Sequence, residues 1–120
     1  MKVAISFIGT NRYLDYLPQY YENIEKYFLP NSEKTILAFT DGELNDTPDN
    51  LKVYHQEHLP WPYITLKRFE IINKAREEIL KNDWFVFIDA DALPVATVTE
   101  KEFLERCCGA STNEVPLFGV

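Results

Sequence analysis

The sequence predicts an α/β sandwich in which a mostly parallel sheet is flanked by helices. Three observations predict this fold: short β-branched and aromatic runs alternate with amphipathic stretches, the run at Trp84–Ile88 is almost continuously apolar, and 120 residues suffice for one domain but not for two. Strands that alternate with helices pair in parallel, and a strand that is apolar on both faces lies inside such a sheet. We therefore expect a single domain over residues 1–120, with its ligand site beyond the carboxyl ends of the strands.

The first two expected elements are a strand at Lys2–Ile8, which ends at Gly9, and a helix that follows it. The helix is expected because apolar side chains recur at steps of three and four residues, which places them on one face. These side chains are Leu14, Leu17, Tyr21, Ile24 and Phe28. Pro18 must then lie in the first turn of the helix, where proline is tolerated.

Two further strands are expected at Thr35–Thr40 and Leu51–His55, separated by a polar surface loop at Asp41–Asn50. The prolines around Trp61 exclude helix there, and a second amphipathic helix is expected from about Thr65 to Lys81. The apolar face of that helix consists of Leu66, Phe69, Ile72 and Ile79.

The last elements follow the apolar strand Trp84–Ile88, which runs directly into Asp89-Ala-Asp91. Thr99 and Glu102 have the spacing of a capping box and predict a short third helix. The buried side of this helix is expected to be Phe103 and Leu104. The apolar stretch Val115–Val120 is expected to form another strand.

Composition excludes several classes of protein. Twelve Lys and Arg against nineteen Asp and Glu give a net charge of −7, so broad electrostatic attraction to nucleic acid or to an anionic membrane is not expected. No apolar stretch has the length of a membrane span or a secretory leader. The two cysteines, Cys107 and Cys108, are adjacent, which offers no disulfide framework and favours a cytoplasmic location.

The pair Asp89 and Asp91 is the clearest candidate site. Two carboxylates that end a buried strand repel each other unless a cation lies between them. Such hard oxygen ligands hold Mg²⁺ or Mn²⁺ against a diphosphate. The alternative is two solvated turn aspartates, because this spacing is common by chance. The position at the end of the strand favours the metal site.

Lys67 and Arg68 fall in the expected first turn of the second helix, where the helix dipole disfavours cations. An anionic ligand would explain this placement, since two cations and free backbone N–H groups would converge on a phosphate. A solvated basic pair that partners Glu70 or Asp91 is an equally open alternative.

Trp61 and two histidines are weaker candidates. The ring of Trp61 could form the wall of a pocket, but packing on the sheet is the favoured interpretation. His55, Glu57 and His58 resemble a metal cluster, yet in an extended segment the two histidines point to opposite faces, so surface histidines are expected.

Four spaced blocks, which together cover nearly the whole chain, carry a family resemblance. They are Ile8-Gly-Thr10 with Tyr13, Trp61–Phe69, Trp84–Asp91 and Pro116-Leu-Phe-Gly119. In this order they resemble the N-terminal half of the family-six glycosyltransferases, the group of α1,3-galactosyltransferases and blood-group A and B transferases with bacterial relatives.

The resemblance implies a GT-A-like, Rossmann-like fold that binds UDP-galactose or UDP-N-acetylgalactosamine, with Asp89 and Asp91 engaging Mn²⁺ or Mg²⁺. It implies retaining transfer of the hexose to an acceptor sugar, with the cation neutralising the UDP leaving group. The donor-binding residues that it implies are Ile8, Gly9, Thr10, Tyr13, Lys67, Arg68, Asp89, Ala90 and Asp91.

The family's catalytic domain is much longer than this chain, which is therefore expected to be a truncated form of it. No catalytic residue is assignable, because the family's glutamate at the reacting carbon would lie beyond Val120. Two other functions stay open: a module that binds nucleotide sugar without turnover, and half of a split or self-associating enzyme that pairs through its C-terminal strand.

Overall fold

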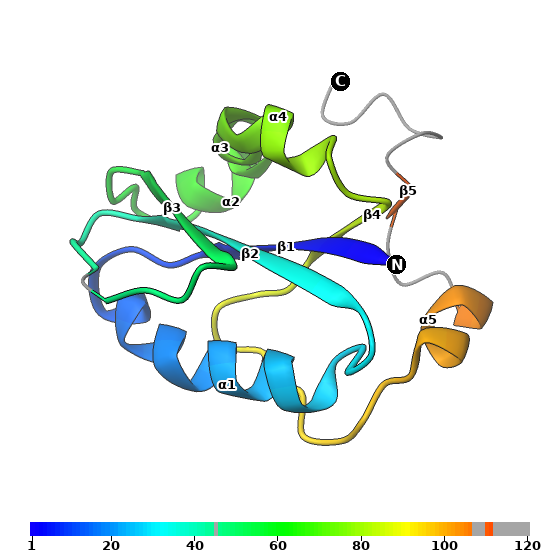
Figure 1. The fold of residues 1–120 in the computed structure, drawn as a ribbon. Coiled ribbons are helices and arrows are strands. Elements are labelled where there is room, and N and C mark those ends of the chain that lie inside the picture. The colour runs from blue at the N-terminus through cyan, green and yellow to red at the C-terminus, as the bar shows by residue number, and fades with distance from the viewer. Residues whose placement is uncertain (45, 107–109, 112–120) are drawn as a thin grey trace.

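The computed structural model describes residues 1–44, 46–106 and 110–111. Its centre is a five-stranded sheet with the order β3-β2-β1-β4-β5 (Figure 1). The strands are β1 (Lys2–Ile8), β2 (Glu33–Thr40), β3 (Leu51–His55), β4 (Trp84–Phe87) and β5 (Ala110–Ser111). β1 pairs in parallel with β2 and β4, β2 pairs in parallel with β3, and β5 runs antiparallel to β4. The prediction of a mostly parallel sheet is confirmed.

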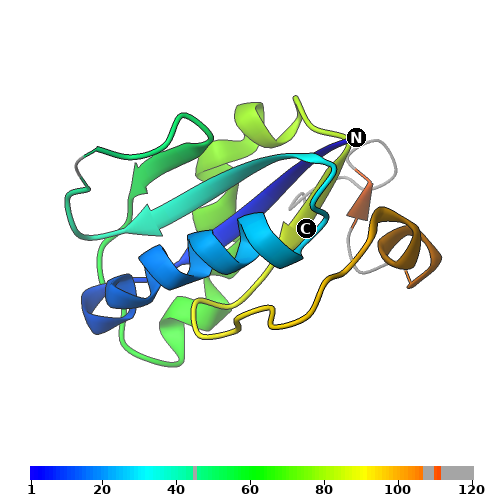
Figure 2. The same cartoon turned by 60° about the horizontal axis from the view of Figure 1, so that its bottom comes forward.

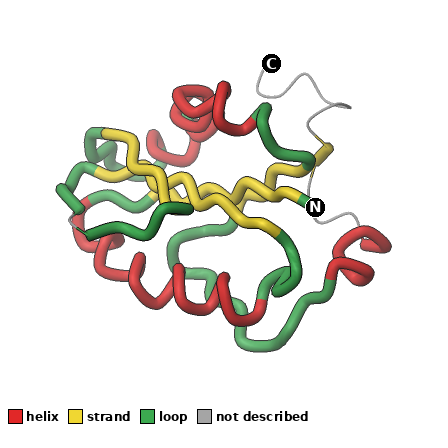
Figure 3. The backbone as a smooth tube through the Cα atoms, viewed as in Figure 1, coloured by secondary structure: helices red, strands yellow, loops and turns green. Residues whose placement is uncertain are grey.

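Helices cover both faces of the sheet (Figure 1; Figure 3). One face carries α1 (Leu17–Tyr27), which follows the short 3-10 helix η1 (Asn11–Tyr16) and lies in front of the strands in Figure 2. The other face carries α2 (Tyr63–Leu66), α3 (Arg68–Ile72), the 3-10 helix η2 (Asn73–Ala75) and α4 (Arg76–Ile79). The flanked sheet is the architecture expected for a Rossmann-like domain.

The apolar core consists of two clusters, one on each face of the sheet. Successive residues of a strand point to opposite faces. Ile5 and Phe7 of β1 therefore enter the cluster beneath α1, whereas Ala4 enters the cluster beneath α3 and α4. Val86 and Phe85 of β4 divide in the same way. The prediction that this strand is covered on both faces is confirmed.

The predicted first helix is confirmed as α1, with Pro18 in its first turn. Ile24 is buried as expected, but Tyr20 is fully buried although the apolar pattern did not include it. Tyr21, which the pattern did include, is only partly buried against the core.

The predicted continuous helix from Thr65 to Lys81 is wrong, because the segment is broken into the short pieces α2, α3, η2 and α4. The backbone leaves the helical region at Lys67 (φ −95°, ψ 11°) and again at Ala75 (φ −103°, ψ 18°). Lys67 thus lies at a junction between two helices rather than inside a first turn.

These breaks change which side chains of the segment are buried. Ile72 and Ile79 are buried as predicted, whereas Leu66 is 72% exposed and Phe69 is 51% exposed. Each break rotates the helical piece that follows it, so that Ile71 packs against the sheet in place of Leu66 and Phe69.

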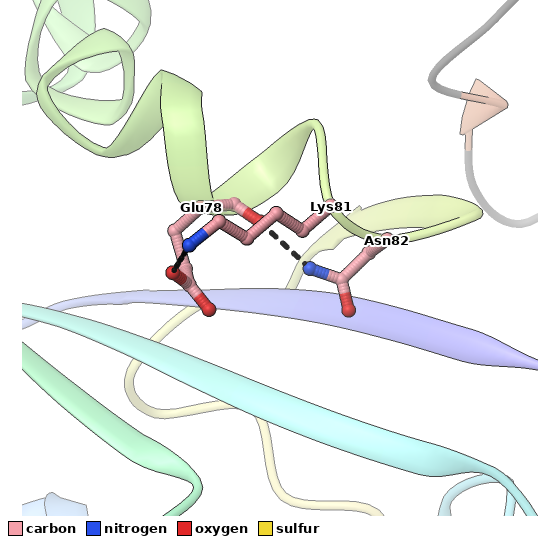
Figure 4. A network of polar contacts seen from close by, with 3 residues as sticks. All are labelled: Glu78, Lys81 and Asn82. Atoms are coloured by element: carbon pink, nitrogen blue, oxygen red, sulfur yellow. Dashed lines mark hydrogen bonds and ion pairs between the residues drawn. The ribbon is translucent and has the colours of Figure 1, made fainter.

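A side-chain cap lies at the end of α4 (Figure 4). The amide Nδ2 of Asn82 donates to the carbonyl of Glu78 at 2.9 Å, and the Nζ of Lys81 lies 3.4 Å from a carboxylate oxygen of Glu78. The carbonyl of Glu78 also accepts from the backbone N–H of Lys81 at 3.2 Å, so the Asn82 amide is its second donor at the end of the helix.

The third helix is confirmed as α5 (Glu100–Arg106), which lies beside the amino end of the sheet (Figure 1). The backbone N–H of Glu102 donates to the Oγ1 of Thr99 at 3.2 Å, as the predicted cap requires. Phe103 is buried as expected, but Leu104 is 48% exposed. The predicted strand Val115–Val120, with its block Pro116–Gly119, and the pair Cys107 and Cys108 lie outside the described residues.

Candidate functional site

The strand order reverses between β1 and β4, because β2 and β3 extend the sheet on one side of β1 while β4 lies on the other. Ladder pairing between β1 and β4 ends at Ser6 and Phe87, and the two continuing chains then separate. Ligands of α/β proteins bind in the crevice that forms at such a switch point.

A cleft of about 260 Å³ lies at this point. Six of the residues expected from the sequence line it: Ile8, Thr10, Tyr13, Asp89, Ala90 and Asp91. Ile8 ends β1 and the next two residues follow it, while the last three follow β4, so the sheet brings together two segments that are far apart in the sequence.

The other three expected residues lie outside this cleft. Arg68 lines an adjoining cavity of about 90 Å³ together with Asp89, and its guanidinium lies 4.1 Å from the ring centroid of Phe87. Lys67 is exposed at the helix junction. Gly9 is buried, and its backbone N–H donates to the carbonyl of Phe39 at 3.0 Å.

Asp89, Ala90 and Asp91 form a tight turn. The backbone N–H of Ala92 donates to the carbonyl of Asp89 at 3.0 Å, which closes the turn. The side chain of Ala90 is buried while both aspartates are exposed. The turn therefore presents two carboxylates to the cleft from a fixed backbone.

Five residues that line the cleft were not predicted as donor-binding residues: His58, Leu59, Trp61, Ile64 and Thr65. Trp61 is 81% exposed and lines the cleft, so the expectation that it packs on the sheet is wrong. Its neighbours Pro60 and Pro62 keep it out of regular structure, so no sheet face covers its ring. His58 is exposed, as expected, but its Nδ1 lies 2.9 Å from the Oγ1 of Thr10, which places it at the cleft wall.

The cleft combines an apolar wall with oxygen ligands. Ile8, Trp61 and Ile64 supply the apolar surface, and the acidic turn supplies the oxygens. Within the described part of the chain, no group of three or more His, Cys, Asp or Glu side chains is arranged to hold a metal ion. A cation here would therefore take its remaining ligands from a bound molecule or from water, which is how Mg²⁺ is usually held beside phosphates.

Over most of its length the chain is similar to a bacterial glycosyltransferase. No family model matches the chain. Over 107 residues, which are 88% of this chain, the sequence is 28% identical to the O-antigen biosynthesis glycosyltransferase WbnI of Escherichia coli. The chain covers 46% of that protein, or about half of its length. This likeness supports the resemblance to glycosyltransferases in general. The resemblance to family six rests on the sequence motifs alone. Among the described helices, none is long and apolar enough to cross a membrane.

Proposed function

We propose that this chain is the nucleotide-sugar-binding unit of a glycosyltransferase and that its cleft binds UDP-galactose or UDP-N-acetylgalactosamine. One observation carries the proposal: the two segments that resemble donor-binding motifs meet in one cleft at the switch point of the sheet. The similarity to a protein named as a glycosyltransferase supports the same function.

In this proposal, the uridine lies against the segment from Ile8 to Tyr13 and the exposed ring of Trp61. A flat base loses little entropy when it stacks on an aromatic ring, and the apolar wall excludes water from it. The diphosphate then points toward the acidic turn. Arg68 in the adjoining cavity supplies a positive charge beside it. Lys67, which lines neither cavity, is expected to contribute less.

A divalent cation fits this arrangement. A diphosphate would be repelled by Asp89 and Asp91 in a chain whose net charge is −7. Mn²⁺ or Mg²⁺ would be held by the two carboxylates and would neutralise the UDP leaving group when bound. The reaction proposed is retaining transfer of the hexose to an acceptor sugar; the catalytic carboxylate that this needs is not assigned to any described residue. The cytoplasmic location stays a prediction.

The test is calorimetric titration of UDP-galactose into the protein with MnCl₂ and, separately, with EDTA. Binding is expected only with the cation, and Asp91→Asn is expected to abolish it. Asp49→Asn removes the same charge from an exposed position just before β3 and is expected to bind like the wild type. Absence of binding to the wild type with MnCl₂ would refute the proposal.

A second candidate function is a module that binds nucleotide sugar without turnover. It is favoured because the cleft proposed to bind the donor is present, while no catalytic carboxylate is assigned among the described residues. Release of UDP in the presence of a lactose-type acceptor distinguishes the two functions. Acceptor-dependent release supports the transferase, whereas tight binding without release supports the module.

A further inference from the structure

The inner side of α1 carries a buried hydroxyl beside the point at which β1 and β4 separate. Tyr20 is fully buried, and its ring packs edge-on against Phe7 with 4.8 Å between centroids. Its hydroxyl lies 3.0 Å from the carbonyl oxygen of Ser6 and 2.9 Å from that of Ile88. A phenol has one proton to donate, so both carbonyls share it.

These two carbonyls lie where the sheet splits. Ser6 belongs to the last ladder pair between β1 and β4, and Ile88 follows β4 directly. Beyond that pair the ladder no longer satisfies the backbone of the departing chain, and a half-buried carbonyl needs another donor. Tyr20 supplies it immediately before Asp89 and so fixes the point at which the acidic turn begins.

A second side chain of α1 holds the chain after the turn. Asn23 lies one helical turn beyond Tyr20 and on the same side of α1. Its Nδ2 donates to the carbonyl of Pro94 at 2.9 Å, while its Oδ1 accepts a hydrogen bond from Gln19. The segment that contains both aspartates is thus attached to one helix on both of its sides.

We propose that Tyr20 and Asn23 are positioning residues that clamp the acidic turn, so that Asp89 and Asp91 stay together at the cleft. Two neighbouring carboxylates repel each other, and a turn that is free to relax would move them apart. Groups that orient ligand side chains in this way raise affinity for the ligand without touching it. That the two carboxylates bind a cation and UDP rests on the proposed function, whereas the hydrogen bonds of the clamp are a property of the fold.

The experiment compares Tyr20→Phe and Asn23→Ala with Tyr21→Phe. The control removes a hydroxyl from the same helix, but that hydroxyl donates to Asn50 at 2.8 Å, away from the turn. The first measurement is hydrogen exchange of the Ala92 amide, whose bond to Asp89 closes the turn. Exchange is expected to be about tenfold faster in both clamp variants and unchanged in the control.

The second measurement is calorimetric titration of UDP in excess MnCl₂. The clamp variants are expected to bind roughly tenfold to a hundredfold more weakly than the wild type, and the control is expected to bind equally well. Asn23→Ala changes a partly exposed residue and keeps the test valid if Tyr20→Phe fails to fold.

Unchanged exchange of Ala92 in the folded clamp variants would overturn the clamp, whether or not UDP binds. Faster exchange with wild-type affinity for UDP would overturn its role in positioning the carboxylates. If the wild type itself does not bind UDP with MnCl₂, the proposed function fails, and the clamp is then decided by the Ala92 exchange alone.

Discussion

Gly9 directly follows β1, next to Thr10 of the cleft, and has no room for a side chain. A Cβ at this position would lie 2.4 Å from the ring of Phe7, which is fully buried, and 3.2 Å from the carbonyl oxygen of Tyr13. Gly9→Ala is therefore expected to destabilise the fold by about 1–3 kcal/mol through overpacking. It is also expected to weaken UDP binding, because the displaced backbone carries Thr10.

Urea unfolding measures this prediction, and Gly42→Ala is the matched control. A Cβ at Gly42 meets the end of Leu14, a flexible and only partly buried side chain that can move aside. A loss of stability at Gly42 as large as that at Gly9 would contradict the steric explanation.

Substitution of the exposed Trp61 distinguishes an effect on ligand binding from an effect on stability. Because the side chain is 81% exposed, Trp61→Ala is expected to change the free energy of unfolding by no more than about 0.5 kcal/mol. If the ring stacks on uracil, the same change weakens UDP binding by about tenfold. Tyr63→Ala removes a nearby exposed aromatic ring that does not line the cleft, and calorimetry should find its affinity unchanged.

At the scale of elements, α1 is held at its C-terminal end by a buried lysine. The Nζ of Lys34 on β2 donates to the carbonyls of Ile24 at 3.0 Å, Glu25 at 3.2 Å and Phe28 at 2.8 Å. Lys34→Met keeps the length of the stem but removes these donors, so unfolding is expected to become easier by about 1–3 kcal/mol. Lys52→Met on β3 changes an exposed lysine and should leave the urea midpoint nearly unchanged.

The elements that could be predicted from the sequence are those with a strong local period. β1 begins and ends where the apolar run predicted, because a buried parallel strand needs an unbroken apolar stretch. β3 also has its predicted bounds, although it is an edge strand of which only Leu51 is buried. The segment after Trp61 was predicted less well. Its apolar residues fit a continuous helix, but the breaks at Lys67 and Ala75 depend on packing against the sheet, which periodicity does not contain.

The sequence predicted which segments form the candidate site but not the contacts that support it. The motifs located the segments after β1 and β4, and the parallel order then required them to meet. The contacts that support the site could not be read from the sequence. Tyr20 and His58 reach it from a helix and a loop distant in the chain, and only the folded arrangement brings their polar atoms to Ile88 and Thr10.

At the scale of the whole molecule, several buried titratable side chains make the free energy of unfolding depend on pH in the alkaline range. Burial raises the pKa of Tyr20 far above its ordinary value of 10.0, and the nearby negative charge of Asp89 raises it further. Burial also raises the pKa of Tyr21 and Tyr54. Burial lowers the pKa of Lys34, whose contribution therefore has the opposite sign. The large shift at Tyr20 leads us to expect the tyrosines to dominate.

A group whose pKa is higher in the folded state contributes stability that is complete below its unfolded pKa and is lost as pH rises. Above pH 10.0 the unfolded chain releases the Tyr20 proton while the folded chain keeps it, so the free energy of unfolding should fall there. Tyr20→Phe removes this group and should lose stability less steeply than the wild type between neutral and alkaline pH, as measured by urea unfolding at each pH. If the free energies of unfolding of the two proteins fell in parallel with pH, the Tyr20 hydroxyl would ionise as easily as one in water. We expect otherwise, because this hydroxyl donates to the carbonyls of Ser6 and Ile88, which favour its protonated form.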